Sequence, residues 1–186
     1  MGRGPGRGAP VTLDLWDYAV KIYDLPGVKD ALLKLQDRYH FDVNTVIWCV
    51  WAARCGYRLE PGEVVRIQSA TSAMAMHTTR PLRSVRLFLS APKTGFAEKD
   101  LEALRADVLA AEIKSEELVL RRLDAVTRAA ATPIPDDGPL QGRAEELFQT
   151  TRRNVDRPIM IANEESPESP TGLFRTLIQT VENAGP

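Results

Sequence analysis

The sequence is poor in the residue types from which reactive sites are built. Its 186 residues include only two cysteines and two histidines. Cys49 and Cys55 fall in one predicted helix, where their side chains lie on different faces, so their spacing predicts free thiols rather than a disulfide. His40 and His77 fall at predicted helix ends with no nucleophile motif around them. We predict no catalytic residue, no metal site and no cofactor, because these four residues also lack the tight spacing of a zinc site.

Excess charge and long apolar runs are missing as well. The formal net charge is −1 and the pI is about 6.2, without the positive charge typical of nucleic-acid-binding proteins, so nucleic acid is a disfavoured partner. The longest apolar run covers residues 46–53, whereas a membrane span needs about 20 apolar residues. Residues 1–10 contain two arginines but no apolar segment of a secretory signal. Together with free thiols, these absences predict a cytoplasmic protein with no membrane span.

What remains is the composition of an ordinary folded chain, divided into three regions. Residues 1–11 are expected to form a flexible basic tail. Residues 12–131 contain all three tryptophans and all four tyrosines and are expected to form a single helical domain. Residues 132–186 hold nine acids and five arginines, so we expect an acidic, linker-like, mostly disordered tail with a candidate short helix at 172–183.

Apolar spacing within the central region predicts an all-α, compact multi-helix bundle. Helices are expected at about 13–23, 28–39, 43–54, 60–77, 81–89 and 97–131. The third helix is apolar on every side, can be capped by Asp42 and is followed by Gly56 as a C-terminal stop. Because it is too short for a membrane, we expect it to be buried by its neighbours. The last helix contains no glycine or proline and is expected to be long.

Charge is unevenly divided between two of these regions. Residues 54–93 hold seven basic and two acidic residues, whereas residues 98–124 hold eight acidic and five basic residues. The two regions either pair with each other within the fold, which the balance of charges favours, or offer a surface to a partner. The candidate partner surface consists of Arg80, Arg83, Arg86, Glu112 and Glu116.

A second set of residues could line a ligand pocket between helices. This candidate pocket consists of Trp16, Tyr23, Gln36, Asp37 and Trp48. Aromatic residues at helical spacing are more typical of a core, and the polar residues around Asp42 and Asn44 are explained by helix capping.

Several short stretches resemble a family of small, uncharacterised, all-helical proteobacterial proteins that share a domain of unknown function. These stretches are Trp16 to Trp51 with Tyr23, Pro26-Gly27-Val28, Leu35-Gln36-Asp37 and Asp42-Val43-Asn44, then Pro81-Leu82-Arg83 and the run 111–116. The resemblance covers residues 13 to about 126 and departs at His40, where the family pattern suggests glycine. It implies a helical fold in a bacterial cytoplasm and no established reaction.

Two functions follow as hypotheses. The leading one is a non-enzymatic protein–protein interaction or adaptor protein with a protein partner, since catalytic spacing is absent and charge is segregated. The alternative is a helical protein that binds a small molecule or cofactor, with an enzyme activity left open.

Overall fold

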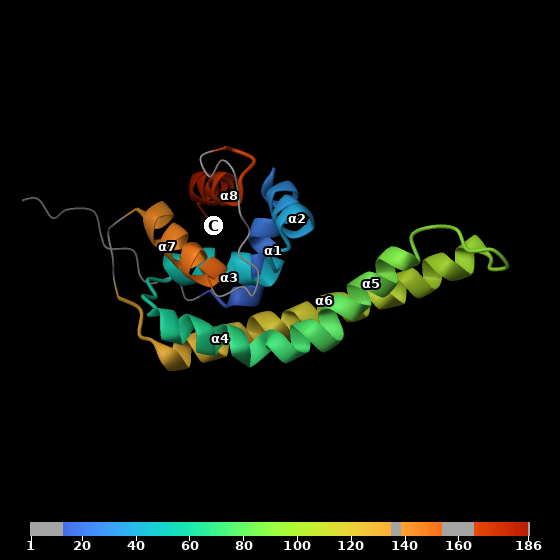
Figure 1. Ribbon diagram of the computed structural model, residues 1–186, viewed down its shortest axis with the longest axis horizontal. Helices are drawn as coiled ribbons and strands as arrows, with labels where there is room; N and C mark the ends of the chain where they lie inside the picture. The colour runs from blue at the N-terminus through green and yellow to red at the C-terminus, as the bar shows by residue number, and fades with distance from the viewer. Residues whose placement is uncertain (1–12, 135–138, 154–165, 186) are drawn as a thin grey trace, which may run out of the picture.

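The computed structural model describes residues 13–134, 139–153 and 166–185, and this part of the chain is all-α, as predicted (Figure 1). The expected flexible tail at 1–11 lies outside the described residues. The described helices are α1 (Leu15–Tyr23), α2 (Val28–Tyr39), α3 (Val43–Arg54), α4 (Pro61–Met74), the π-helix η1 (Ala75–Thr79), α5 (Arg80–Phe88), α6 (Glu98–Ala130), α7 (Leu140–Arg153) and α8 (Pro170–Ala184).

Helix α3 is the centre of the core, which confirms the prediction made from its composition. Asp42 caps it by accepting a hydrogen bond from the backbone N–H of Thr45 at 3.0 Å, and nine of its twelve residues are buried. Gly56 follows with a φ of 81°, and a Cβ there would lie 2.5 Å from the Ile134 carbonyl oxygen. Glycine is therefore required at this turn.

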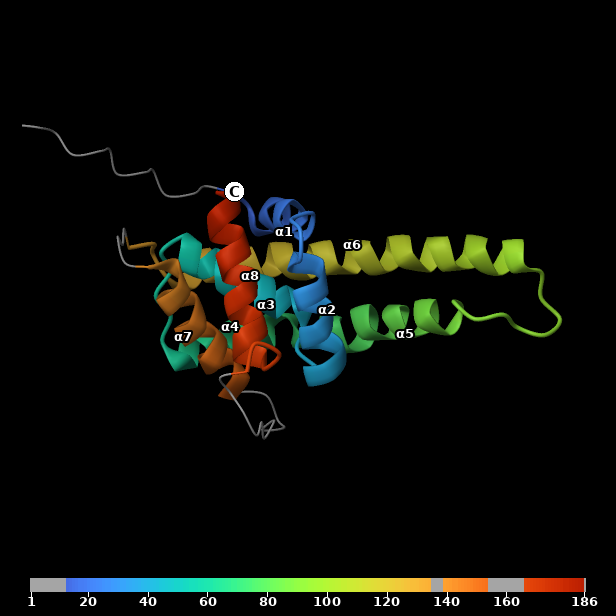
Figure 2. The same ribbon diagram turned by 90° about the horizontal axis from the view of Figure 1, so that it is seen from above.

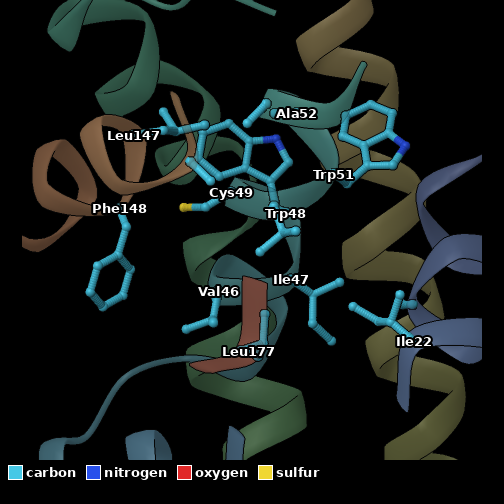
Figure 3. Packing of buried hydrophobic residues seen from close by; sticks show 14 of the residues in the cluster. Ile22, Val46, Ile47, Trp48, Cys49, Trp51, Ala52, Leu147, Phe148 and Leu177 are labelled. Atoms are coloured by element: carbon cyan, nitrogen blue, oxygen red, sulfur yellow. The ribbon is translucent and has the colours of Figure 1, made fainter. Parts of the chain in front are cut away.

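Helices α7 and α8 complete the core, so the prediction of a linker-like region at 132–186 is wrong for α7, whereas α8 is the candidate short helix of that prediction. Figure 3 shows Leu147 and Phe148 of α7 on one side of α3, with Trp51 on the opposite side, toward α6. Phe148 also stacks on Phe174 of α8 with ring centroids 4.2 Å apart. The buried residues of α7 recur at helical spacing but are diluted by charged neighbours, and the region's net acidity concealed them.

The short helix expected at 172–183 is α8, which begins two residues earlier at Pro170 and ends at Ala184. Ser169 caps it by accepting a hydrogen bond from the backbone N–H of Gly172 at 3.0 Å. Its apolar face is buried against α2 and α7. The helical domain thus extends beyond residue 131 to α8, and the rest of the expected tail, at 135–138 and 154–165, lies outside the described residues.

Helices α4 and α5 were expected to be separated near His77, but they form one rod joined by η1. The backbone N–H of Arg80 donates to the Ala75 carbonyl, five residues back, which is the hydrogen bond of a π-turn. Pro81 has no N–H to donate to the preceding turn, and the wider π-turn lets the helix continue past it. The proline therefore marks an irregular turn rather than a helix end.

The outer part of this rod and of α6 projects from the bundle as a two-helix arm, here defined as residues 80–110 (Figures 1 and 2). Helix α5 has no buried residue, and Phe88 and Phe96 near the tip are 64% and 70% exposed. The long helix predicted at 97–131 is confirmed as α6, whose second half packs on the bundle. The base of the arm is consequently the place where α5 and α6 meet α1, α2 and α3.

Candidate functional site

A cavity of about 370 Å³ lies at the base of the arm and is here named the arm-base pocket. It is lined by residues from α1, α2, α3, α5 and α6 and by Asp24, which follows α1. The lining residues are Trp16, Ala19, Val20, Tyr23, Asp24, Leu33, Gln36, Val43, Asn44, Ile47, Arg83, Arg86, Leu109, Glu112, Ile113, Glu116 and Leu120. Most of them are apolar, and the polar ones are concentrated on α5 and α6. This combination is typical of small-ligand sites.

Arg83 organises the charged side of the pocket. Its Nε donates to Glu112 Oε1 at 2.9 Å, its Nη2 to Glu116 Oε1 at 2.5 Å and its Nη1 to Gln36 Oε1 at 2.5 Å. One guanidinium therefore joins α5 to α6 and to α2. The planar fork of arginine suits such a multiple contact, and lysine could not reproduce it.

Glu112 is the most enclosed carboxylate of the pocket, with 3% of the residue exposed. Arg86 donates to both of its oxygens, from Nε to Oε2 at 2.5 Å and from Nη2 to Oε1 at 3.2 Å, in addition to the bond from Arg83. Burial disfavours the charge, but the hydrogen bonds from Arg86 and Arg83 outweigh it and lower the pKa of Glu112. Glu112 is thus an ionised anchor for two arginines.

The charge of Glu116, one turn further along α6, is stabilised less well than that of Glu112. Burial raises its pKa, and the attraction of Arg83 does not cancel that effect. Only its Oε1 receives a hydrogen bond within the described residues, from Arg83. Burial and the nearby Glu116 charge also raise the pKa of Tyr23. The pocket therefore contains one carboxylate whose charge is incompletely compensated.

Asn44 is the least expected polar residue of the pocket. It lies in the first turn of the apolar helix α3, is 4% exposed and lines the cavity. No hydrogen bond joins its side-chain amide to a described residue, and its nitrogen and oxygen are not among the fully buried atoms that lack a partner. The amide therefore faces the cavity, where a water molecule or a ligand can hydrogen-bond to it.

Helical spacing explains how the sequence brings the charged groups together. Arg83 and Arg86 are three residues apart on α5, and Glu112 and Glu116 are four apart on α6, so each pair lies on one face of its helix. The two helices run antiparallel and side by side (Figure 2), which sets the pairs opposite each other. The predicted pairing of the basic and acidic regions within the fold is confirmed for these four residues.

The structure merges most of the two predicted residue sets into one site. Trp16, Tyr23 and Gln36 of the candidate pocket line the cavity beside Arg83, Arg86, Glu112 and Glu116 of the candidate partner surface. The remaining members, Asp37, Trp48 and Arg80, do not line it.

Asp37 is exposed because it is turned about 100° around α2 from Gln36. Trp48 is fully buried in the core, where its Nε1 donates to Thr127 Oγ1 at 2.9 Å. Arg80 is exposed at the start of the arm. Asn44 was assigned to helix capping from the sequence; its signal as a site residue was a polar side chain in an otherwise apolar helix.

Two further features are absent from the described residues, a metal site and a membrane span. No group of three or more histidine, cysteine, aspartate or glutamate residues in that part of the chain is placed to hold a metal ion. None of the helices described is both long enough and apolar enough to cross a membrane.

The fold and the pocket together define a class: an all-α protein with a projecting two-helix arm and a partly charged pocket at its base. Residues 14–123 match a family described as "Protein of unknown function (DUF2390)". Because the match covers more than half of the 186 residues, the chain belongs to this family. All residues that line the pocket fall within the matched range, whereas α7 and α8 follow it. No curated protein and no solved structure matches the chain.

Proposed function

We propose that the protein binds a small organic molecule in the arm-base pocket. The observation that carries this proposal is the side-chain amide of Asn44, which belongs to a residue that is 4% exposed, lies in the wall of a cavity of about 370 Å³ and has no hydrogen bond to a described residue. A polar side chain in an otherwise apolar helix, facing a cavity, is explained if a ligand hydrogen-bonds to it. The aromatic and aliphatic walls supply the apolar contact area that such a ligand needs.

The test compares Asn44→Leu with the wild-type protein. Leucine has the same branching and number of side-chain heavy atoms as asparagine but no hydrogen-bonding groups, so it removes the donor and the acceptor that face the cavity. A metabolite library screened by thermal shift should contain ligands that stabilise the wild type, by roughly 2.7 kcal/mol at a hundred times their Kd. Asn44→Leu should lose that response.

Asn183→Leu is the matched control, because it makes the same exchange at an exposed position of α8, outside the pocket. It should keep the full response to each ligand. The proposal fails if no compound in the library shifts the wild type, or if every shift is the same in Asn44→Leu.

A second candidate function, a protein–protein interaction, is favoured by a separate observation on the arm. Val85, Leu87, Phe88, Phe96 and Leu104 are large apolar residues that the bundle leaves exposed. We propose that a second copy of the chain covers them, arm against arm, because two helical hairpins can bury such residues as a four-helix bundle. An antiparallel two-fold pairing would also place Arg80 of one copy near the exposed acidic start of α6, residues 98–102, in the other.

Light scattering after size-exclusion chromatography tests this pairing over a range of concentrations. The wild type should shift from monomer to dimer, and Phe88→Glu with Leu104→Glu should stay monomeric. Val65→Glu, at an exposed apolar residue of α4 outside the arm, is the control and should still dimerise. A wild type that is monomeric at all concentrations would rule out a second copy as the partner.

We also propose that the protein is located in a bacterial cytoplasm. A bacterial cytoplasm, expected from the resemblance, agrees with the two cysteines, which are buried free thiols. Burial raises the pKa of Cys49 to about 12 and that of Cys55 to about 11, so both stay protonated at neutral pH. Such thiols are structural rather than reactive.

A further inference from the structure

We infer that the ligand of the arm-base pocket carries a protonated amine on an apolar body, with the ammonium group directed at Glu116. This inference rests on the proposed small-molecule function and adds the chemical class of the ligand. Three features of the pocket support this inference: its net negative charge, its open acceptor atoms and its aromatic wall.

The pocket has more negative than positive groups. Its lining contains two arginines, Arg83 and Arg86, and three acids, Asp24, Glu112 and Glu116. Asp42, just before α3, also acts electrostatically on Arg83 and Glu116. An additional positive charge would therefore be attracted to the pocket, and an additional negative charge would be repelled.

The arginines are already occupied. All three guanidinium nitrogens of Arg83 donate hydrogen bonds, and two of the three in Arg86 are directed at Glu112. An anionic ligand would have to compete with Glu112 for these donors while lying close to Glu116. The cluster is thus neutralised from within and is a poor anion site.

Two acceptors remain open at the cavity. Glu116 Oε2 receives no hydrogen bond within the described residues, and neither does the side-chain oxygen of Asn44. Both residues line the same cavity, one from α6 and the other from α3. An ammonium group has three hydrogen-bond donors and no acceptor. It could donate to these two open acceptors without needing a donor from Arg83 or Arg86, which are already bound to Glu112.

The wall beside these acceptors suits the rest of such a ligand. Trp16 and Tyr23 of α1 supply aromatic rings, and Leu109 and Ile113 of α6 supply aliphatic surface. Cations bind favourably to the faces of tryptophan and tyrosine, and the apolar body of the ligand would cover the aliphatic residues. The raised pKa of Glu116 supports the same view, since a bound cation would restore the stability of its charged form.

Three probes of nearly equal size and shape test the inference: 2-phenylethylamine, 2-phenylethanol and 3-phenylpropionate. Each is titrated at pH 7 into the full chain up to millimolar concentration, and binding is followed by chemical-shift changes in the NMR spectrum. The amine should bind about tenfold more tightly than the alcohol, as expected for one charge-assisted contact. The carboxylate should bind most weakly.

Glu116→Gln should remove the preference for the amine and leave the affinity for the alcohol nearly unchanged. The matched control is Glu117→Gln, the same substitution at the next residue of α6. Glu117 is not among the lining residues and pairs with Lys114 and Arg121. It should keep the preference for the amine.

The possible results separate the inference from the function on which it rests. If the alcohol or the carboxylate binds the wild type as tightly as the amine, or if Glu116→Gln keeps the preference, the ammonium assignment is overturned while the small-molecule function stands. If none of the probes binds the wild type at millimolar concentration, the ammonium assignment is overturned, and the small-molecule function then stands or falls with the library screen.

Discussion

The core around α3 and the arm use large apolar residues in opposite ways. In the core, Trp48, Trp51 and Phe148 are fully enclosed by residues from several helices. On the arm, Phe88 and Phe96 lie open, and α5 has no buried residue at all. The arm therefore has almost no core of its own; its two helices continue into the bundle, and ion pairs at its base hold α5 to α6. Stability is concentrated in the bundle, and the residues available for binding are concentrated at and beyond the joint.

The largest expected effect comes from comparing two phenylalanines, one in each region. Phe148→Ala should lower the free energy of unfolding by about 3–5 kcal/mol, because it removes a ring that is 1% exposed and stacked on Phe174. Phe88→Ala should change it by less than about 0.5 kcal/mol. Urea denaturation of both variants measures the difference, and equal losses would contradict the division of the molecule into core and arm.

The contribution of the ion pairs at the base of the arm can be measured by substituting Glu112. Glu112→Gln leaves Arg83 and Arg86 without their shared carboxylate, and should lower the free energy of unfolding by about 2 kcal/mol, since both arginines retain some contact with solvent. Hydrogen exchange of the α5 amides should accelerate by more than that of α3.

Glu117→Gln is the control here as well, because its carboxylate pairs only with Lys114 and Arg121 along α6 in the described structure. Little change in stability is expected from it. If Glu112→Gln were as mild as this control, the ion pairs could not be what holds α5 to α6 at the base of the arm.

A smaller effect is expected from acid. The pKa of Glu112 is lowered in the folded protein, so its contribution is complete above the ordinary glutamate pKa of 4.5 and is lost as the pH falls through the folded value. Glu116, whose pKa is raised, opposes this trend because its protonated form is favoured in the folded state. Denaturation at pH 6 and pH 3.5 should show a loss in the wild type that is about 1 kcal/mol larger than in Glu112→Gln.

The sequence was informative about features that depend on a single helix, such as its burial, its ends and its charges. The apolar composition of residues 43–54 predicted a buried α3, and Asp42 and Gly56 predicted both of its ends. The unbroken run of strong helix formers predicted α6, and charge segregation favoured pairing between the regions 54–93 and 98–124, which the structure shows for Arg83 and Arg86 although both had been assigned to a partner surface. Each of these inferences needs only local spacing, capping or the sign of a charge.

The sequence was less informative about features that several helices form together. The apolar face of α7 was diluted by arginine and glutamate, so packing against α3 decides its burial more than its composition does. The pocket is formed by five helices, and spacing shows which residues share a face but not which faces come together. Trp48 illustrates this limit, because it lies next to Ile47 in sequence yet points into the core while Ile47 lines the pocket.

The π-turn at Ala75–Thr79 determines which side chains of α5 face α6. It inserts one additional residue into what is otherwise a continuous helical rod, so every residue after it is rotated by about 100° relative to an uninterrupted α-helix. Deleting one residue from this turn would leave a helix of nearly the same length and composition, but its arginines would face away from Glu112. A change of length at this one turn would therefore remove Arg83 and Arg86 from the pocket without altering the identity of any residue that lines it.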